Sequence, residues 1–289
     1  MSFRQVVDWG VYAEQHGYGY FFRSDHLQPT NGDLKRDSPE CWITLGALAA
    51  KTVRIKFGPM VSPVGFRNPT LLAQMACNLH SYCNGRLLLG VGAGWYEKEY
   101  LAKGYEFPEV DVRREQLVEA LKIIKPLVEG EQVAFRGNYY AANTTCYPKG
   151  KVHLILGGWS KSIREATVEY ADEWNLFNGA PEDFKELKQQ IAQTGRRVVI
   201  SRTGPFFIAK NRAQLRRQLR SKAKLLKVDW NLPATIDELN KQEVLCGDVN
   251  EFACQLSELK KAGVDRFYFD IFDPDDTQMV NLLTRALSN

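Results

Sequence analysis

Residues 84–95 read Asn-Gly-Arg-Leu-Leu-Leu-Gly-Val-Gly-Ala-Gly-Trp, and this stretch decides the fold class. Its apolar run, Arg86–Val91, is typical of a strand that is buried on both faces of a parallel sheet. The run passes directly into Gly92-Ala93-Gly94. Glycines at a strand end either pack the following loop tightly or let a flat ligand approach the backbone, and both interpretations stay open. The spacing is not the dinucleotide-binding fingerprint, because the third glycine comes too early.

Apolar strands and amphipathic helices alternate on both sides of this stretch. The predicted strands are 18–23, 53–61, 86–91, 152–156, 174–177, 198–209 and 266–272. The predicted helices are 3–15, 39–51, 70–82, 112–128, 162–170, 182–193, 211–226, 250–262 and 276–287. A helix after nearly every strand predicts a parallel α/β sheet with helical crossovers. The closed form at this length is a (β/α)8 TIM barrel, and because the chain opens on a helix we expect the first strand to be lacking.

We expect one TIM-barrel domain over residues 1–289, with two departures from the alternation. The first is an insertion at about 96–148, with a short helix and a hairpin around Gly137-Asn138. The second is an irregular excursion at about 228–246. Ser38, Asp111 and Asp248 precede predicted helices and are the expected N-caps.

The composition is that of a globular protein, with 44% hydrophobic and 25% charged residues. Lys+Arg 38 against Asp+Glu 34 gives a net charge of 38 − 34 = +4, which is too mild to indicate nucleic-acid binding. No apolar run is long enough for a membrane span, and the first residues lack a signal core. Six scattered cysteines without a Cys-x-x-Cys pair then indicate reduced thiols in a cytoplasmic protein.

Two further features concern ligands. The four histidines are far apart in sequence, and no pattern of metal ligands surrounds them, so we expect no metal site. The predicted helix at 211–226 begins a strongly basic segment that reaches Lys227. Such a segment is either a solvated helix face or a contact for a polyanionic ligand tail.

In a barrel, the chemistry lies at the carboxyl ends of the strands. The strand 18–23 delivers Asp25 and His26 there. The histidine can exchange a hydrogen bond or a proton with a ligand, while the alternative is a capping Asp beside a surface His. Pro59, inside the predicted strand 53–61, indicates either a bulge or strained peptide or an ordinary strand end.

The strand 152–156 ends in Gly157-Gly158-Trp159-Ser160, where a helix starts immediately. Free N–H groups at a helix N-terminus, with glycines that allow close approach, favour a phosphate site. The later βα loops often hold phosphate in barrels. The alternative is a helix that Ser160 caps and that binds no ligand.

Taken together, these segments resemble the luciferase-like monooxygenase superfamily, and within it the deazaflavin oxidoreductases that use coenzyme F420. The resemblance rests on the shared order of segments along nearly the whole chain. These segments are 19–26, 52–58, 67–69, 84–95, 155–158, 171–175 and 262–265.

The resemblance implies a flavin-type ring across the strand ends of the barrel. It implies a non-prolyl cis peptide at Met60-Val61 that props the ring, and a phosphate held at Gly157 and Gly158. His26 is the implied catalytic residue, and together with Asp25 it would face the redox-active edge of the ring. The implied cofactor-binding residues are Asp25, Met60, Val61, Ser62, Gly92, Gly94, Gly157, Gly158, Trp159 and Ser160.

The resemblance implies hydride transfer between F420 and a small organic substrate, and a homodimer, because family members are often dimers. The net charge and the short apolar runs predict no nucleic-acid or membrane partner. Two alternatives stay open: an FMN-dependent monooxygenase, and a truncated flavin-binding barrel without turnover. Trp95 stands where the sugar-phosphate dehydrogenases of the family have a glutamate, and Thr30 replaces their active-site tryptophan. Both departures argue against glucose 6-phosphate as the substrate.

Overall fold

The structure is a computed structural model that describes all residues except 31–34, 226–235, 272–275 and 289. It divides the chain into two compact units. Unit 1 holds Met1–Pro29 and Lys35–Trp174, and unit 2 holds Asn175–Asn289 together with the short segment 30–34. The expected single domain stays a prediction.

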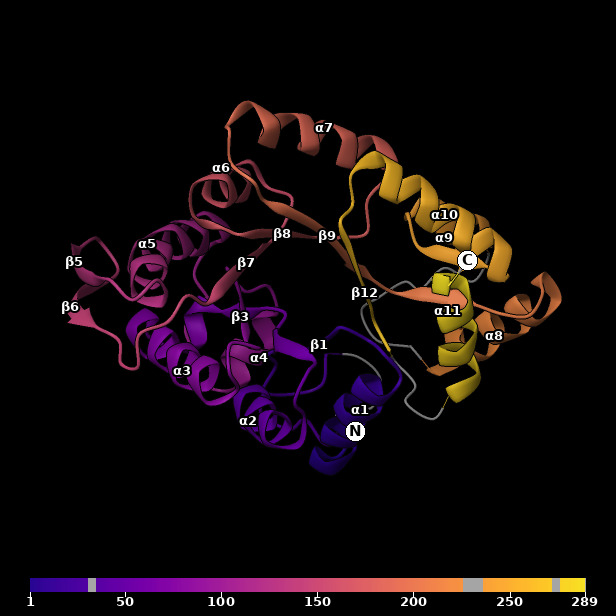
Figure 1. Cartoon of the computed structure of the whole chain (residues 1–289), viewed down its shortest axis with the longest axis horizontal. Coiled ribbons are helices and arrows are strands. Elements are labelled where there is room, and N and C mark those ends of the chain that lie inside the picture. The colour runs from indigo at the N-terminus through magenta and orange to yellow at the C-terminus, as the bar shows by residue number, and fades with distance from the viewer. Residues whose placement is uncertain (31–34, 226–235, 272–275, 289) are drawn as a thin grey trace. The chain divides into compact units, whose positions relative to one another are not determined.

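Unit 1 carries most of the predicted alternation, and Figure 1 shows its elements in colours from indigo through magenta to a reddish pink. In chain order they are α1 (Phe3–Gln15), β1 (Tyr20–Arg23), α2 (Cys41–Lys51), β2 (Lys56–Pro59), β3 (Ser62–Pro63), the 3-10 helix η1 (Val64–Phe66), α3 (Pro69–Tyr82), β4 (Leu88–Gly92), α4 (Glu97–Ala102), α5 (Val110–Val128), β5 (Gln132–Arg136), β6 (Ala141–Thr145), β7 (His153–Gly157), α6 (Lys161–Tyr170) and the start of β8 (Glu173–Phe177). The described residues before Tyr20 hold α1 and no strand, as expected.

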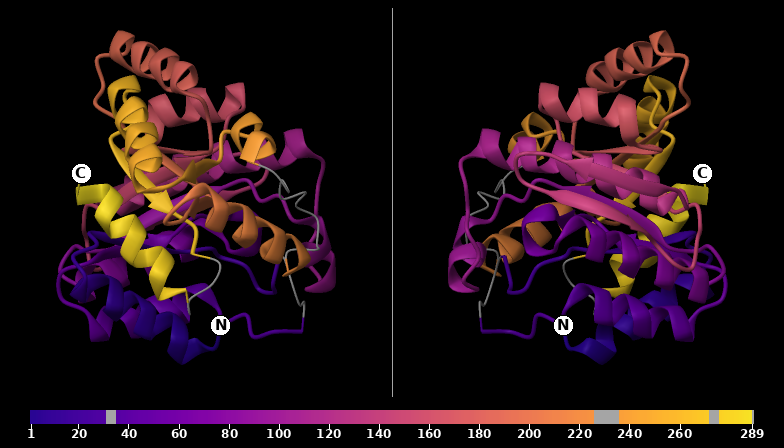
Figure 2. Two further views of the ribbon diagram at one scale, coloured as in Figure 1. Left: turned by 90° about the vertical axis from the view of Figure 1, so that its right-hand side faces the viewer. Right: turned by 90° about the vertical axis from the view of Figure 1, so that its left-hand side faces the viewer.

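The strands of unit 1 are parallel apart from the β5–β6 hairpin. β1 pairs with β2, and β4 pairs with β3 on one side and with β7 on the other, all in parallel. β4 is buried along its whole length, which confirms the strand predicted at 86–91. The hairpin lies within the expected insertion beside α5, as Figures 1 and 2 show.

Local sequence signals explain where the helices of unit 1 begin. Ser2 and Gln5 form a capping box at α1, which spans the predicted residues 3–15. Asn68 caps α3 and Pro69 occupies its first turn, where a missing N–H costs nothing. These helices turn apolar faces inward, and α3 buries Leu72 against the core.

Two of the expected caps are wrong. Glu40, not Ser38, caps α2, because its carboxylate accepts the backbone N–H of Ile43 at 2.7 Å. Glu109, not Asp111, is the N-cap position of α5, and its side chain makes no capping hydrogen bond. Asp111 lies instead inside the first turn, where its negative charge interacts favourably with the positive end of the helix dipole.

The predicted strand 53–61 is shorter and ends at Pro59 as β2. The peptide bond between Met60 and Val61, just after β2, is cis, and β3 begins at Ser62. The cis bond predicted by the family resemblance is therefore confirmed.

Unit 2 begins within β8 and continues to the end of the chain. Its further elements are α7 (Pro181–Gln193), β9 (Val199–Gly204), β10 (Phe206–Ile208), α8 (Arg212–Leu225), α9 (Ile236–Lys241), β11 (Leu245–Gly247), α10 (Val249–Ala262), β12 (Arg266–Phe269) and α11 (Thr277–Ser288). β8, β9 and β12 are neighbours in that order, and β10 pairs with β11. α7 and α10 lie side by side (Figure 2).

Two expectations for unit 2 need correction. The single strand predicted at 198–209 is two strands, because Pro205 lacks the N–H that would continue the ladder. The excursion at 228–246 is not irregular throughout: residues 228–235 lie outside the described part of the chain, and the rest holds α9 and β11. Asp248 caps α10 in a capping box, as expected. No helix in the described ranges is long and apolar enough to span a membrane.

Candidate functional site

Asp25 follows β1 and lies at the centre of a buried polar cluster. Its side chain is fully buried, and one of its oxygens accepts the hydroxyl of Ser62 at 2.5 Å. Ser62 in turn accepts the indole N–H of Trp42 at 3.1 Å. The carboxylate of Asp25 is thus held by protein groups, which links the end of β1 to the start of β3.

Arg67 completes this cluster from the charged side. Its guanidinium donates to Asp25 at 2.7 and 3.3 Å and to Glu40 at 2.5 Å. Burial alone would lower the pKa of Arg67, but the two carboxylates outweigh it and raise that pKa above its usual value. The cluster therefore neutralises a buried Asp25 with a permanent cation.

His26 faces a different partner. Its Nδ1 lies 2.6 Å from Oε2 of Glu99, on α4. A carboxylate only accepts hydrogen bonds, so Nδ1 is the donor in this contact, and in the neutral ring Nε2 is then the acceptor. The ring of His26 also meets Trp95 edge-on, with 5.7 Å between ring centroids.

Glu99 is the functional candidate that sequence reasoning missed. Its side chain is 0% exposed, and its second oxygen accepts the backbone N–H groups of Leu27 and Gln28. One carboxylate therefore fixes both the loop after β1 and the orientation of His26. A charged residue inside the short helix predicted at 96–103 was the available signal, but 73 positions separate it from His26.

Met60 and Val61 are both half-buried beside this cluster. The N–H of Met60 donates to the carbonyl of Arg23 at 2.8 Å, which ties the segment to the end of β1. Ser62 is fully buried. The structure thus places Asp25, Ser62 and the cis peptide close together, and their role with a cofactor stays a prediction.

Gly92 and Gly94 have packing reasons of their own. A Cβ on Gly92 would lie 2.7 Å from Cγ2 of Val61, and one on Gly94 would collide with the hydroxyl of Tyr100. Gly94 also has φ +81°, which favours glycine. Tight packing of the loop, one of the two interpretations of this motif, accounts for both residues.

The segment Gly157–Ser160 joins β7 to α6 and is half-buried. Gly158 has φ +132°, and its carbonyl accepts the indole N–H of Trp174 at 3.0 Å. Ser160 caps α6 through a 3.4 Å bond from the N–H of Ile163. Within the described ranges, no hydrogen bond joins this segment to His26 or Asp25, so the structure forms two separate groups of candidate residues.

The basic segment at 211–227 is only partly described. Arg212 pairs with Glu251 at 2.6 Å, and Arg216 and Arg217 are exposed. Residues 226 and 227 lie outside the described part of the chain. A role for this segment with a ligand tail stays a prediction.

Comparison with known proteins relates the chain to one family. The family model described as luciferase-like monooxygenase matches residues 1–268. An F420-dependent glucose-6-phosphate dehydrogenase of Microbacterium testaceum (strain StLB037) is 39% identical over 202 residues, which is 66% of this chain and 60% of that protein. The enzyme of the same name from Nakamurella multipartita is 32% identical over 204 residues, or 67% and 60%. The chain spans about three fifths of the length of these curated relatives.

Solved structures show the same fold at lower identity. An F420-dependent secondary alcohol dehydrogenase in complex with an F420-acetone adduct has a TM-score of 0.82 at 21% identity, covering 99% of this chain and 94% of that one. The oxygenating constituent of 3,6-diketocamphane monooxygenase, from a plasmid of Pseudomonas putida and in complex with FMN, has a TM-score of 0.75 at 19% identity, covering 100% and 93%. The match of the family model over residues 1–268 shows that the chain belongs to the luciferase-like monooxygenase family.

Proposed function

We propose that the protein is an oxidoreductase that transfers a hydride between F420 and a small organic substrate. The observation that carries this proposal is His26, which Glu99 holds with Nε2 as the free acceptor. The two curated relatives reported above are named F420-dependent glucose-6-phosphate dehydrogenase, which supports it. The F420-dependent secondary alcohol dehydrogenase with the same fold supports it as well.

The residues at the start of α6 fit a cofactor that carries phosphate. The N–H groups of Lys161 and Ser162 have no helical acceptor, and in the described part of the chain no other group accepts them. Gly158, with its positive φ, removes side-chain bulk from the approach to these donors. Gly157–Ser160 would therefore hold the phosphate, and the segment 60–62 would support the ring.

When bound, F420 supplies a two-electron carrier that accepts or donates a hydride. The protein's own contribution is to manage the accompanying proton. With Nδ1 bonded to Glu99, Nε2 of His26 can take the hydroxyl proton of an alcohol as its carbon is oxidised. Glu99 stabilises the imidazolium that results, because it is a buried carboxylate 2.6 Å away.

A titration of the purified protein with F420 and with FMN tests the cofactor. We expect F420 to bind more tightly, and Gly157→Val to weaken that binding at least about tenfold, which is about 1.4 kcal/mol. Gly19→Val, at an exposed position where an added Cβ meets nothing within 4 Å and the backbone is not left-handed, is the matched control. Tighter binding of FMN, with oxygen-dependent turnover, would favour the monooxygenase alternative. Binding of either cofactor without any turnover would favour the non-catalytic barrel.

A homodimer in the cytoplasm is the assembly that we infer for this enzyme. Ile43 on α2 and Leu71 on α3 are exposed, so unit 1 presents apolar side chains on two helices. All six cysteines are free thiols, which fits a reducing compartment. Light scattering on the purified chain at several concentrations distinguishes a dimer from a monomer.

A further inference from the structure

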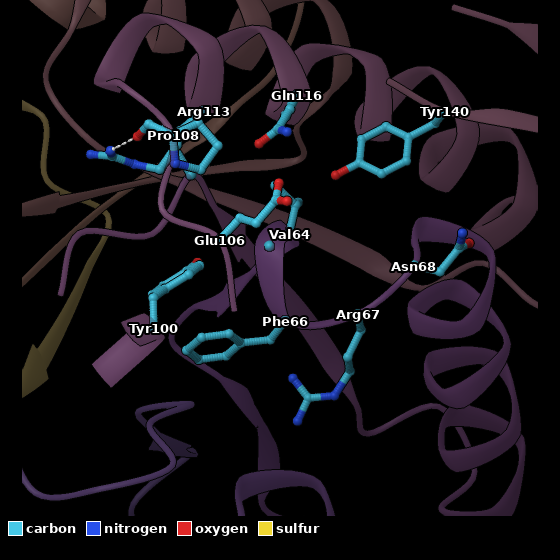
Figure 3. A pocket seen from close by; sticks show the side chains of 12 residues that line it. Val64, Phe66, Arg67, Asn68, Tyr100, Glu106, Pro108, Arg113, Gln116 and Tyr140 are labelled. Carbon is cyan, nitrogen blue, oxygen red and sulfur yellow. Dashed lines mark hydrogen bonds between the residues drawn. The ribbon is translucent and has the colours of Figure 1, made fainter. Parts of the chain in front are cut away.

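Unit 1 contains a cavity of about 310 Å³ between η1 and the insertion, apart from the residues assigned above to the cofactor. Its walls come from η1, α4, the segment before α5, α5 itself and Tyr140 (Figure 3). The volume equals that of about ten water molecules at ~30 Å³ each, which suits a small organic molecule. Glu106 on its wall is exposed, so the cavity is reachable from solvent.

Two polar atoms in this wall are buried without a partner in the described part of the chain. They are the hydroxyl of Tyr100, a residue only 2% exposed, and Nε of Arg113. Buried polar groups in native proteins nearly always have a partner, so each of these two atoms has a hydrogen bond to make with a ligand or an ordered water. Burial also raises the pKa of Tyr100, which keeps its hydroxyl protonated and able to donate.

Other polar side chains point into the same space. Figure 3 shows the polar ends of Glu106, Gln116 and Tyr140 directed toward the interior of the cavity. Phe66 adds an apolar surface on which carbon atoms can pack. The wall therefore combines donors, acceptors and one hydrophobic face.

The charges around the cavity are balanced. The guanidinium of Arg67 forms ion pairs with Asp25 and Glu40, so it offers no free charge to a ligand. The guanidinium of Arg113 donates to the carbonyl of Pro108, and the carboxylate of Glu106 stands on the same wall. A wall of this kind gives an anion no net attraction.

We propose that this cavity binds a small neutral molecule with several hydroxyl groups, a polyol or a free sugar. Hydroxyl groups both donate and accept, and so match the hydroxyls of Tyr100 and Tyr140, the amide of Gln116 and the carboxylate of Glu106. The site is distinct from the proposed cofactor site, and the proposal does not depend on which cofactor the enzyme uses.

Binding here would contact the two elements that hold the site residues. Tyr100 is the neighbour of Glu99 on α4, and Arg67 lies between the cavity and Asp25. An occupied cavity therefore tightens α4 and the end of η1, the parts of the chain that position His26 and Asp25.

Saturation-transfer NMR on the full chain without cofactor tests the proposal, with erythritol, D-glucose and inorganic phosphate as probes. We expect saturation-transfer signals from erythritol and D-glucose at millimolar concentration. Added inorganic phosphate should not displace either of them. Tyr100→Phe and Gln116→Leu should each weaken binding about five- to tenfold. Tyr139→Phe is the matched control, because its hydroxyl bonds to Glu115 on the exposed surface.

Three results would overturn the proposal. They are no signal from either hydroxylated probe, equal binding by all three variants, and competition by phosphate. If Tyr100→Phe does not fold, Gln116→Leu alone carries the comparison with Tyr139→Phe. A cavity that holds only water gives the first of these results.

Discussion

Removal of the Glu99 carboxylate should destabilise unit 1 far more than removal of any exposed acid on the same helix. The carboxylate accepts two backbone N–H groups, from Leu27 and Gln28, as well as Nδ1 of His26. Hydrogen bonds to a charged acceptor contribute about 1.5–3 kcal/mol each, and the donors that lose this acceptor are left without a partner. Since part of this loss is recovered when water reaches the loop, we expect Glu99→Ala to lower the free energy of unfolding by about 3–5 kcal/mol.

Two further variants separate charge from geometry. Glu99→Gln keeps an oxygen for the two backbone N–H groups and loses the charge facing His26, so we expect a loss of about 1–2 kcal/mol. Glu97→Ala, at an exposed position of α4, should change the free energy by no more than about 0.5 kcal/mol. Urea unfolding followed by far-UV circular dichroism gives all three values. If Glu99→Ala and Glu97→Ala prove equally stable, the Glu99 carboxylate does not hold the loop after β1. Its proposed role in orienting His26 is then wrong as well.

Three other changes follow from the structure. Gly94→Ala should lower the free energy of unfolding by about 2–5 kcal/mol, because a left-handed backbone is strained and the added Cβ meets the hydroxyl of Tyr100. Gly104→Ala, at φ +76° with nothing within 4 Å, should lower it by only about 1–2 kcal/mol, and thermal unfolding measures both changes. Gly46→Ala, inside α2 with free space around it, should stabilise the protein by about 0.5–1 kcal/mol in the same assay. Burial, opposed by a neighbouring arginine, raises the pKa of Asp270 from 3.8 to about 6, so its neutral form favours folding below pH 4 and this advantage is lost as the pH rises through 6. The stability of the wild type relative to Asp270→Asn should therefore fall by up to about 3 kcal/mol between pH 4 and 7 in urea titrations, and a flat difference would contradict the shift.

The features that sequence reasoning predicted depend on local signals. The helix at 3–15 has its cap and its apolar spacing within its own residues, and so does α3 with Asn68 and Pro69. The buried strand β4 is predicted by its continuous apolar run. Asp25 and His26 follow from their position after a strand, since parallel strands all deliver their ends to one edge of the sheet.

The features that it missed depend on contacts between distant segments. Glu40 replaces Ser38 as a cap because the chain turns into α2 two residues later than the pattern suggests. Glu99 could not be recognised from the sequence, because its carboxylate binds the backbone N–H groups of Leu27 and Gln28, which lie more than 70 positions away. Likewise, Gly94 looks the same in sequence whether it faces a ligand or, as here, packs against a side chain.

Transfer of a labelled hydrogen tests the central claim most directly. An alcohol that carries deuterium on its reacting carbon is incubated with F420 and the protein, and the reduced cofactor is analysed by mass spectrometry. Short secondary alcohols, the substrate class in the name of one related enzyme, are the first to try. Glucose 6-phosphate, which the names of the curated relatives give and against which Trp95 and Thr30 argue, is the comparison. Deuterium in the reduced cofactor, formed about 10²–10⁴ times more slowly by His26→Ala, is the result that we predict. Unlabelled cofactor, or oxygen consumption with FMN in place of hydride transfer, would contradict the account.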